Sequence, residues 1–225
     1  MPYSHANIVD DAEDLTTSQV MLLSILSCSP TKITRIQKLG IFIERILQIN
    51  SDLSHGSYYY GGFSDDLGEA VSSMGGDGAI KNGEEGYKLT QYGADLLTQA
   101  GTNPDNKELV EGILSIVSFF QSLTDFQLKK LSYILYPETT DMSLIKNQMD
   151  LDRDSFRLGD LKVTKGLTRE QLIDKLMLKV TDLDPIIDLL EEGRSVVASP
   201  DGRSCVLLTL QEGKYITTEK IGGRI

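Results

Sequence analysis

The chain has 225 residues, of which 40% are hydrophobic and 24% charged, and it carries a formal net charge of −11. This composition excludes wholesale disorder and fits one large or two modest domains. The acidity opposes non-specific binding to nucleic acid phosphates, because such binding needs clustered Lys and Arg. No apolar run approaches the roughly 20 residues of a membrane-spanning helix, so we expect no membrane partner.

Residues 1–14 are expected to form an acidic, disordered tail. The first fifteen residues contain four acids and no base, unlike a secretory or transit peptide, and we therefore expect a cytoplasmic protein. Cys28 and Cys205 lie in apolar segments and are expected to be buried and unpaired. His5 and His55 lie in polar stretches that we expect to be exposed. Neither histidine has the spacing of a metal site, so we expect no metal and no cofactor.

Two helices are predicted next. Thr17 or Ser18 can cap the first, which ends at Pro30. The second runs from Thr31 or Lys32 to Ile49, with apolar residues at spacings of three and four. Residues 16–50 hold four bases and one acid, a net of +3, and the only basic island in the chain is at residues 32–45. Its bases are Lys32, Arg35, Lys38 and Arg45.

A loop and a third helix follow. Residues 50–56 are expected to form the loop, and three consecutive tyrosines come directly after it. Ser64 is positioned to cap a helix that Gly75 and Gly76 end. Acidic residues at its start suit the positive end of the helix dipole.

A Gly-rich hairpin then closes the first domain. Short strands at 79–81 and 87–89 are expected to be joined by residues 82–86, a segment rich in residues that tolerate positive φ. Thr90 is positioned to cap a closing helix that ends near Gln99. Three helices, a hairpin and a closing helix are typical of a winged helix-turn-helix domain, which we place at residues 15–103.

Residues 104–160 are expected to form a helical extension. The helix at 107–123 is apolar on more than one face, so it is buried within its own domain or forms the seam of a homodimer. Thr124 is expected to cap a helix over 125–135, which Tyr136 and Pro137 close. Residues 143–161 are predicted to be a linker or a surface helix.

Residues 161–225 are expected to form a small α+β unit. Thr168 and Gln171 make a capping box for a helix over 169–179, and Asp184–Pro185 is expected to start a second helix ending at Leu190. Strands are predicted at 195–198, 205–210 and 214–218, with a turn at 199–203. The whole chain is therefore expected to be α+β and mainly helical.

Three strings carry a resemblance to known proteins: TRIQKLGIFIERI, YYYGGFSDDLGEAV and GAIKNGEEGYKLTQYGADLL. They resemble uncharacterised archaeal and bacterial winged-helix proteins, and their layout is similar to that of the Panacea antitoxin family. The later string LTDFQLKKLSYILYPETTDMSLIKNQM resembles a helical extension in some archaeal members. The resemblance covers about residues 15–150 and implies a winged-helix fold. The chain departs from the pattern at Gly62–Phe63, where Pro–Tyr is common.

The leading functional hypothesis is a dimeric transcriptional regulator that binds double-stranded DNA. The second helix and the hairpin would supply its phosphate and base contacts. The residues are Lys32, Thr34, Arg35, Gln37, Lys38, Arg45, Lys81, Asn82 and Lys88. The solvated face of an amphipathic helix would carry the same residue types. Carboxylates on the third helix and at Glu84 and Glu85 oppose groove binding, because DNA phosphates would repel them.

The alternative is a winged-helix module that binds a partner protein and no DNA. Its candidate residues are Tyr58, Tyr59, Tyr60, Asp65, Asp66 and Glu69. If the tyrosines lie in a strand, alternate rings would instead pack inward. No phosphate-binding loop and no catalytic triad is present in the sequence, so we expect no enzyme and no catalytic residue.

Overall fold

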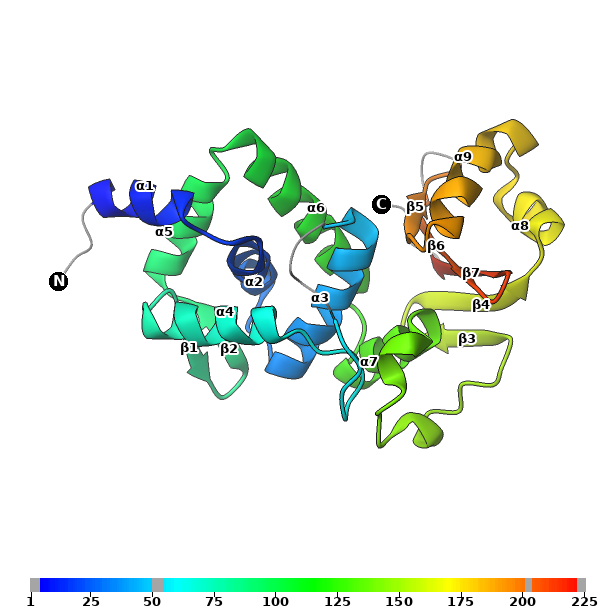
Figure 1. Ribbon diagram of the computed structural model, residues 1–225, viewed down its shortest axis with the longest axis horizontal. Coiled ribbons are helices and arrows are strands. Elements are labelled where there is room, and N and C mark those ends of the chain that lie inside the picture. The colour runs from blue at the N-terminus through cyan, green and yellow to red at the C-terminus, as the bar shows by residue number, and fades with distance from the viewer. Residues whose placement is uncertain (1–4, 50–54, 201–203, 222–225) are drawn as a thin grey trace.

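The structure, a computed structural model, describes residues 5–49, 55–200 and 204–221 (Figure 1). It is an α+β fold, mainly helical, with a two-stranded and a five-stranded sheet. The predicted fold class is confirmed at that level. The first part contains α1 (His5–Glu13), α2 (Thr17–Cys28), α3 (Ile33–Leu47), α4 (Asp65–Gly76), β1 (Ile80–Gly83), β2 (Gly86–Leu89), α5 (Gln91–Ala100), α6 (Pro104–Phe120) and α7 (Asp125–Leu135).

Helix α2 lies at the centre of this helical part. Every residue from Val20 to Leu26 is buried, and α4, α5 and α6 pack around it. Thr16, one residue before the expected cap, caps the helix through a capping box with Gln19. Complete burial explains why α2 shows no polar stripe.

The hairpin of β1 and β2 is antiparallel, and Glu84–Glu85 forms its turn. Thr31, between α2 and α3, pairs with Tyr87 through two backbone hydrogen bonds of 2.8 and 3.0 Å. Gly86 has a φ of +116°, and a Cβ there would lie 2.6 Å from the Thr31 carbonyl. A glycine is therefore required where these two segments meet.

The expected disordered tail is wrong for residues 5–13, which form α1. Ile8 and Ala12, four residues apart, are buried where α1 packs along α5. The Tyr92 hydroxyl donates a 2.7 Å hydrogen bond to Asp11. An acidic sequence is compatible with a packed helix when its few apolar residues share one face.

The second part contains the 3₁₀ turns Pro137–Thr140 and Lys146–Gln148, then β3 (Ser155–Leu158), β4 (Leu161–Leu167), α8 (Arg169–Leu176), α9 (Val180–Glu191), β5 (Val196–Ala198), β6 (Val206–Gln211) and β7 (Lys214–Lys220). The sheet is antiparallel, in the order β3-β4-β7-β6-β5. The three predicted strands are confirmed with small shifts of their ends. The predicted turn at 199–203 lies partly outside the described residues.

The division at residue 161 and the expected linker at 143–161 do not match the sheet. Ser155–Leu158 pairs with Leu161–Thr164, so residue 161 falls inside a hairpin. Helix α9 begins at Val180 rather than at Pro185, because the first turns bury Leu183 in the sheet's own core. The proline removes one backbone donor without ending the helix.

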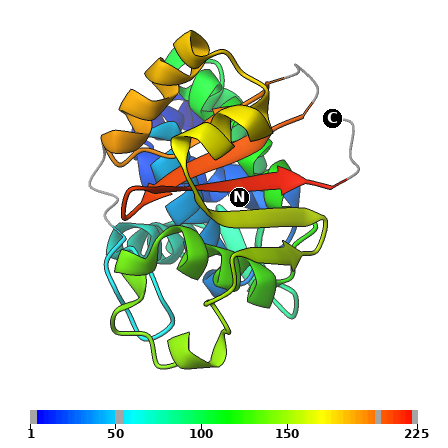
Figure 2. The ribbon, with the colours of Figure 1, turned by 90° about the vertical axis from the view of Figure 1, so that its right-hand side faces the viewer.

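The five-stranded sheet is covered on both faces (Figure 2). Leu208 and Tyr215 point towards α8 and α9, whereas Leu207 and Ile216 join the core of the helical part. Gln211 donates hydrogen bonds of 2.6 and 2.7 Å to the last carbonyls of α7. The two parts therefore share one apolar core.

One face of helix α6 is buried within its own chain, whereas Leu109, Val110, Leu114 and Phe119 are only half-buried, so the homodimer seam stays a prediction. Ile113, Ile116, Val117 and Phe120 are buried, and the Phe120 ring lies 4.4 Å from that of Phe42 in α3. Among the described helices, none alone is long and apolar enough to cross a membrane. Helices α6 and α7 would qualify together, but the chain bends by 109° between them.

Candidate functional site

The polar residues of α3 do not form the exposed basic face that the sequence predicts. Lys38 is 2% exposed and Gln37 3% exposed. The Lys38 ammonium donates a 2.9 Å hydrogen bond to the Gly62 carbonyl. Gln37 makes two hydrogen bonds with the backbone of Ser64, one donated and one accepted. Neither side chain is available to DNA in this fold.

Arg35 and Arg45 are also engaged within the chain. Arg35 donates to the carbonyls of Leu123 and Phe120 at 2.7 and 3.2 Å and pairs with Asp125 at 3.2 Å. Arg45 pairs with Glu138 at 3.4 Å. The Arg35 guanidinium satisfies carbonyls at the C-terminal end of α6, and the two ion pairs connect α3 to α7 and to the 3₁₀ turn Pro137–Thr140.

The rest of the predicted DNA-binding set lies near the hairpin. Lys32, Lys81, Asn82 and Lys88 are exposed, and Thr34 is half-buried. Lys81 and Lys88 are directly opposite each other in the hairpin. Glu84 and Glu85 occupy the exposed turn beside them. The exposed bases are therefore few, and two carboxylates accompany them.

The buried polar groups of α3 hold the segment from His55 to Ser64. His55, expected to be exposed, is buried, and its Nδ1 contacts the Glu44 carboxylate. Gly56 and Phe63 exchange two backbone hydrogen bonds of 3.0 Å. With the bonds of Gln37 and Lys38, these contacts fix both ends of the segment against α3.

The three tyrosines of this segment all face solvent, each about half-exposed, from 46% for Tyr58 to 53% for Tyr60. The expected inward packing of alternate rings is wrong, because the segment turns at Gly61 instead of forming a strand. Gly61 has a φ of +80°, and a Cβ there would lie 2.3 Å from the Tyr133 ring. This turn keeps the three rings on the surface.

Two further apolar side chains extend this surface. The Leu144 N–H donates to the Tyr59 carbonyl at 3.1 Å, and the Met142 N–H donates to the Ser57 hydroxyl at 2.9 Å. Met142 is 55% exposed and Leu144 68% exposed. We call Tyr58, Tyr59, Tyr60, Met142 and Leu144 the aromatic patch. The sequence offered no signal for its second half except two apolar residues in a polar stretch.

Helix α4 continues the aromatic patch. The Tyr58 ring lies 5.2 Å from the Phe63 ring, and a Cβ on Gly68 of α4 would lie 3.5 Å from Phe63. Asp65 and Glu69 are exposed on α4, three residues before and one residue after Gly68, and Asp66 is half-buried. Ser64 caps α4 as predicted. Asp65 and Asp66 also stabilise the helix N-terminus, a structural role that Glu69 lies too far along the helix to share.

Bases are scarce around this surface. Residues 51–80 contain five acids and neither Lys nor Arg. The Lys129 ammonium lies 5.4 Å from the centre of the Tyr60 ring. Burial and, to a smaller extent, the positive charge of Lys129 together lower the pKa of Lys38 to about 7. Aromatic rings beside carboxylates are suited to cationic side chains, which stack on the rings and pair with the acids.

No family model, curated protein or solved structure matches this chain. The resemblance to bacterial and archaeal winged-helix families therefore stays a prediction. Among the described residues, no three His, Cys, Asp or Glu side chains come together as metal ligands. Cys28 is exposed and Cys205 half-buried, both unpaired, so the expected burial of the thiols is wrong.

Proposed function

We propose that this chain is a protein-interaction module whose residues 15–103 form a winged helix. The aromatic patch and α4 together bind a basic segment of a partner protein. One observation carries the proposal: the bases of α3 are bonded inside the fold, whereas the aromatic rings and the acids of α4 face solvent.

The order of elements supports the winged-helix part of this proposal. Helix α2 is followed by the bridging residue Thr31, then by α3, α4 and the hairpin. In winged helix-turn-helix domains the third helix is the one that enters the DNA major groove. Here α4 takes that place in the order and carries Asp65, Asp66 and Glu69 without a base.

The electrostatics favour a protein over DNA as the partner of α4. Carboxylates facing phosphates would be repelled and would lose hydration without gaining a partner. Tyrosine is enriched among the residues that dominate protein interfaces, because its ring buries apolar area while its hydroxyl stays hydrogen-bonded. A partner segment with Arg or Lys would satisfy both the rings and the acids.

The test is affinity purification of the tagged full-length chain, compared with Asp65→Lys plus Glu69→Lys. We expect a basic partner protein that co-purifies with the parent chain and is lost from this variant. The matched control is Asp10→Lys plus Glu13→Lys, the same charge change on the exposed side of α1, which should retain the partner. Retention by the α4 variant would overturn the proposal.

Double-stranded DNA, bound by the exposed hairpin bases, is the alternative partner. We expect the purified chain not to retain genomic fragments at low salt, where phosphate attraction is strongest. Retention that disappears with Lys81→Glu plus Lys88→Glu would replace the protein partner with DNA. Retention that survives this variant would point to a basic surface elsewhere.

A further inference from the structure

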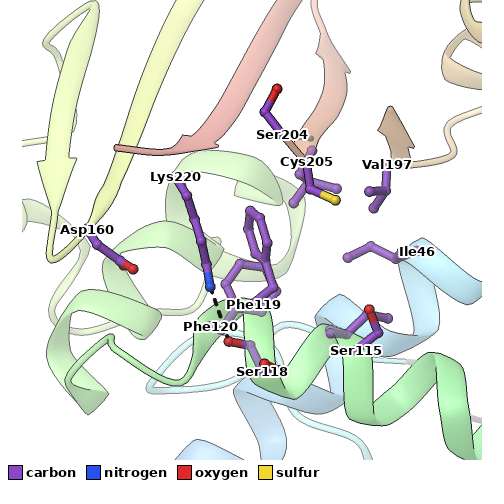
Figure 3. Close-up of a pocket in the computed structure, with 12 residues that line it drawn as sticks. Ile46, Ser115, Ser118, Phe119, Phe120, Asp160, Val197, Ser204, Cys205 and Lys220 are labelled. Carbon is purple, nitrogen blue, oxygen red and sulfur yellow. Dashed lines mark hydrogen bonds between the residues drawn. The ribbon is translucent and has the colours of Figure 1, made fainter. Parts of the chain in front are cut away.

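A second surface feature lies away from the aromatic patch and shares no residue with it. A cleft of about 440 Å³ opens between the helical part and the five-stranded sheet (Figure 3). Helices α3 and α6 line one side, and strands β5, β6 and β7 line the other. Small-molecule sites are commonly about 300–1,000 Å³ and lie between packed units. The cleft has the size and the position of such a site.

The lining of the cleft is mainly apolar, with serines at 115, 118 and 204, and it is charged at one end. The wall is formed by Ile116, Phe119, Phe120 and Leu207. Lys220 and Asp160 lie at one end, and the Cys205 sulfur points towards the other, where Ile46 and Val197 lie (Figure 3). An occupant with one charged end and an apolar body would match this distribution.

The charge at the mouth of the cleft is that of Lys220. Its ammonium makes one long hydrogen bond of 3.5 Å to the Ser118 carbonyl and lies 5.5 Å from the centre of the Phe119 ring. Among the described residues, no carboxylate oxygen lies within 4.0 Å of this ammonium. Because an ammonium has three N–H donors, Lys220 can bind an anion without losing the Ser118 contact.

Asp160 sets a limit on that anion. It is the only carboxylate among the described lining residues, and its Oδ1 accepts a hydrogen bond from the Ser122 hydroxyl. Its negative charge at the same end disfavours a ligand with two negative charges. Glu219, the neighbour of Lys220 in β7, is paired with Lys175 at 2.8 Å. Lys220 is the only base among the described lining residues, so this end can hold a single anionic group on that ammonium.

We propose that this cleft binds a small apolar monocarboxylate, such as a medium-chain carboxylic acid. The carboxylate pairs with Lys220, and the apolar chain lies along Phe119 towards Ile46 and Val197. Because the occupant would contact both α6 and the sheet, it would bind only the state in which the two parts are packed together. This proposal does not depend on the proposed function.

Cys205 supplies a direct readout of occupancy, with decanoate as the probe. In a Cys28→Ser chain, Cys205 is the only thiol, and its alkylation by the uncharged reagent N-ethylmaleimide is followed by mass spectrometry. We expect decanoate at ten times its Kd to slow alkylation about tenfold, since only the empty cleft reacts. Calorimetric titration of the unsubstituted chain with decanoate gives the Kd independently of the cysteine variant.

The role of Lys220 is tested by removing the charge from its side chain or from the ligand. We expect Lys220→Gln to raise the Kd for decanoate about tenfold or more, as losing a charged hydrogen bond does. Lys214→Gln, in the same strand but outside the cleft, should leave the Kd unchanged. Decanol should bind the parent chain about tenfold more weakly than decanoate, and this difference should disappear in Lys220→Gln.

Three results would overturn the proposal. The first is alkylation of Cys205 at the same rate with and without decanoate, together with no heat of binding. The second is a Lys220→Gln chain with an unchanged Kd for decanoate. The third is equal affinity for decanol and decanoate, which would make the cleft a site for neutral apolar molecules.

Discussion

Helices α3 and α4 follow one another in the chain, carry opposite charge, and present that charge in opposite directions. The bases of α3 bond to carbonyls and carboxylates of the same chain, and two of its long polar side chains are almost fully buried. The acids of α4 remain at the surface beside the aromatic patch. The net charge of a sequence segment therefore does not predict the charge that the folded chain exposes to a partner.

Substitution of Gln37 is the strongest test that the polar side chains of α3 are bonded inside the fold. Substitution by Leu leaves the buried N–H and carbonyl of Ser64 without their side-chain partners. We expect Gln37→Leu to lower the free energy of unfolding by about 1–3 kcal/mol, because the buried Ser64 N–H is left without a partner, whereas the Ser64 carbonyl keeps its hydrogen bond from the Gly68 N–H. Urea unfolding measures the loss, and Lys32→Ala, which changes an exposed residue at the start of α3, should stay within about 0.5 kcal/mol. Equal stability of the two variants would contradict the buried position of Gln37.

The burial of Lys38 in α3 should make the free energy of unfolding depend on pH. Its folded-state pKa is about 7, whereas an unfolded lysine has a pKa of about 10.4. Between these two pKa values the unfolded chain binds more protons than the folded chain, so the free energy of unfolding should rise with pH. The stability that the neutral form of Lys38 contributes is lost as the pH falls towards 7. We expect a gain of about 2 kcal/mol between pH 7 and pH 9.

Lys38→Met is the matched control for that measurement. It removes the titrating group, so the part of the pH dependence that belongs to Lys38 should disappear from urea unfolding at the same two pH values. A variant with the same slope as the parent chain would show that the Lys38 ammonium is solvated.

Arg35 tests whether the bases of α3 serve the packing of α6. Substitution by Met keeps most of the apolar stem and removes the donors to Leu123 and Phe120. We expect a loss of about 1–2 kcal/mol, because the Leu123 carbonyl loses its Arg35 donor, whereas the Phe120 carbonyl keeps its hydrogen bond from the Leu123 N–H. Thermal unfolding followed by circular dichroism reports it. An unchanged transition would make Arg35 a surface base that is free for a ligand.

Substitution of Glu69 tests whether the acids of α4 are exposed, and it should have the smallest effect on stability. Its side chain is exposed and makes no hydrogen bond or ion pair with the described residues, so Glu69→Gln should change the free energy of unfolding by less than about 0.5 kcal/mol. The same change should weaken binding of the basic partner, which affinity purification at increasing salt would reveal. A clear loss of stability would assign Glu69 a structural role instead.

The parts of the fold that depend on neighbouring residues in sequence were predictable. The caps at Ser64, Thr90, Thr124 and Thr168 are where the sequence predicts them, because a cap needs only a short polar side chain and the next turn. The Gly-rich hairpin is predictable for the same reason, since its turn needs positive φ and close backbone approach.

The parts that depend on distant residues were not predictable. A polar side chain on an amphipathic helix is assigned to solvent by periodicity, but Gln37 and Lys38 bond to backbone groups 24 to 27 residues away. The aromatic patch joins Tyr59 to Leu144, and the paired residues of β4 and β7 are 48 to 59 positions apart. No local pattern in a single sequence predicts these contacts between distant residues.

The apolar core shared by the helical part and the sheet has a consequence for synthesis on the ribosome. Leu207 and Ile216, which complete that core, are translated long after α2 and α3. At about 5–20 residues per second, the 60 residues from Leu161 to Lys220 take roughly 3 to 12 s to be made. During that interval the nascent helices present an uncovered apolar face. A truncated transcript that ends before β6 should therefore yield a chain that engages chaperones or is degraded.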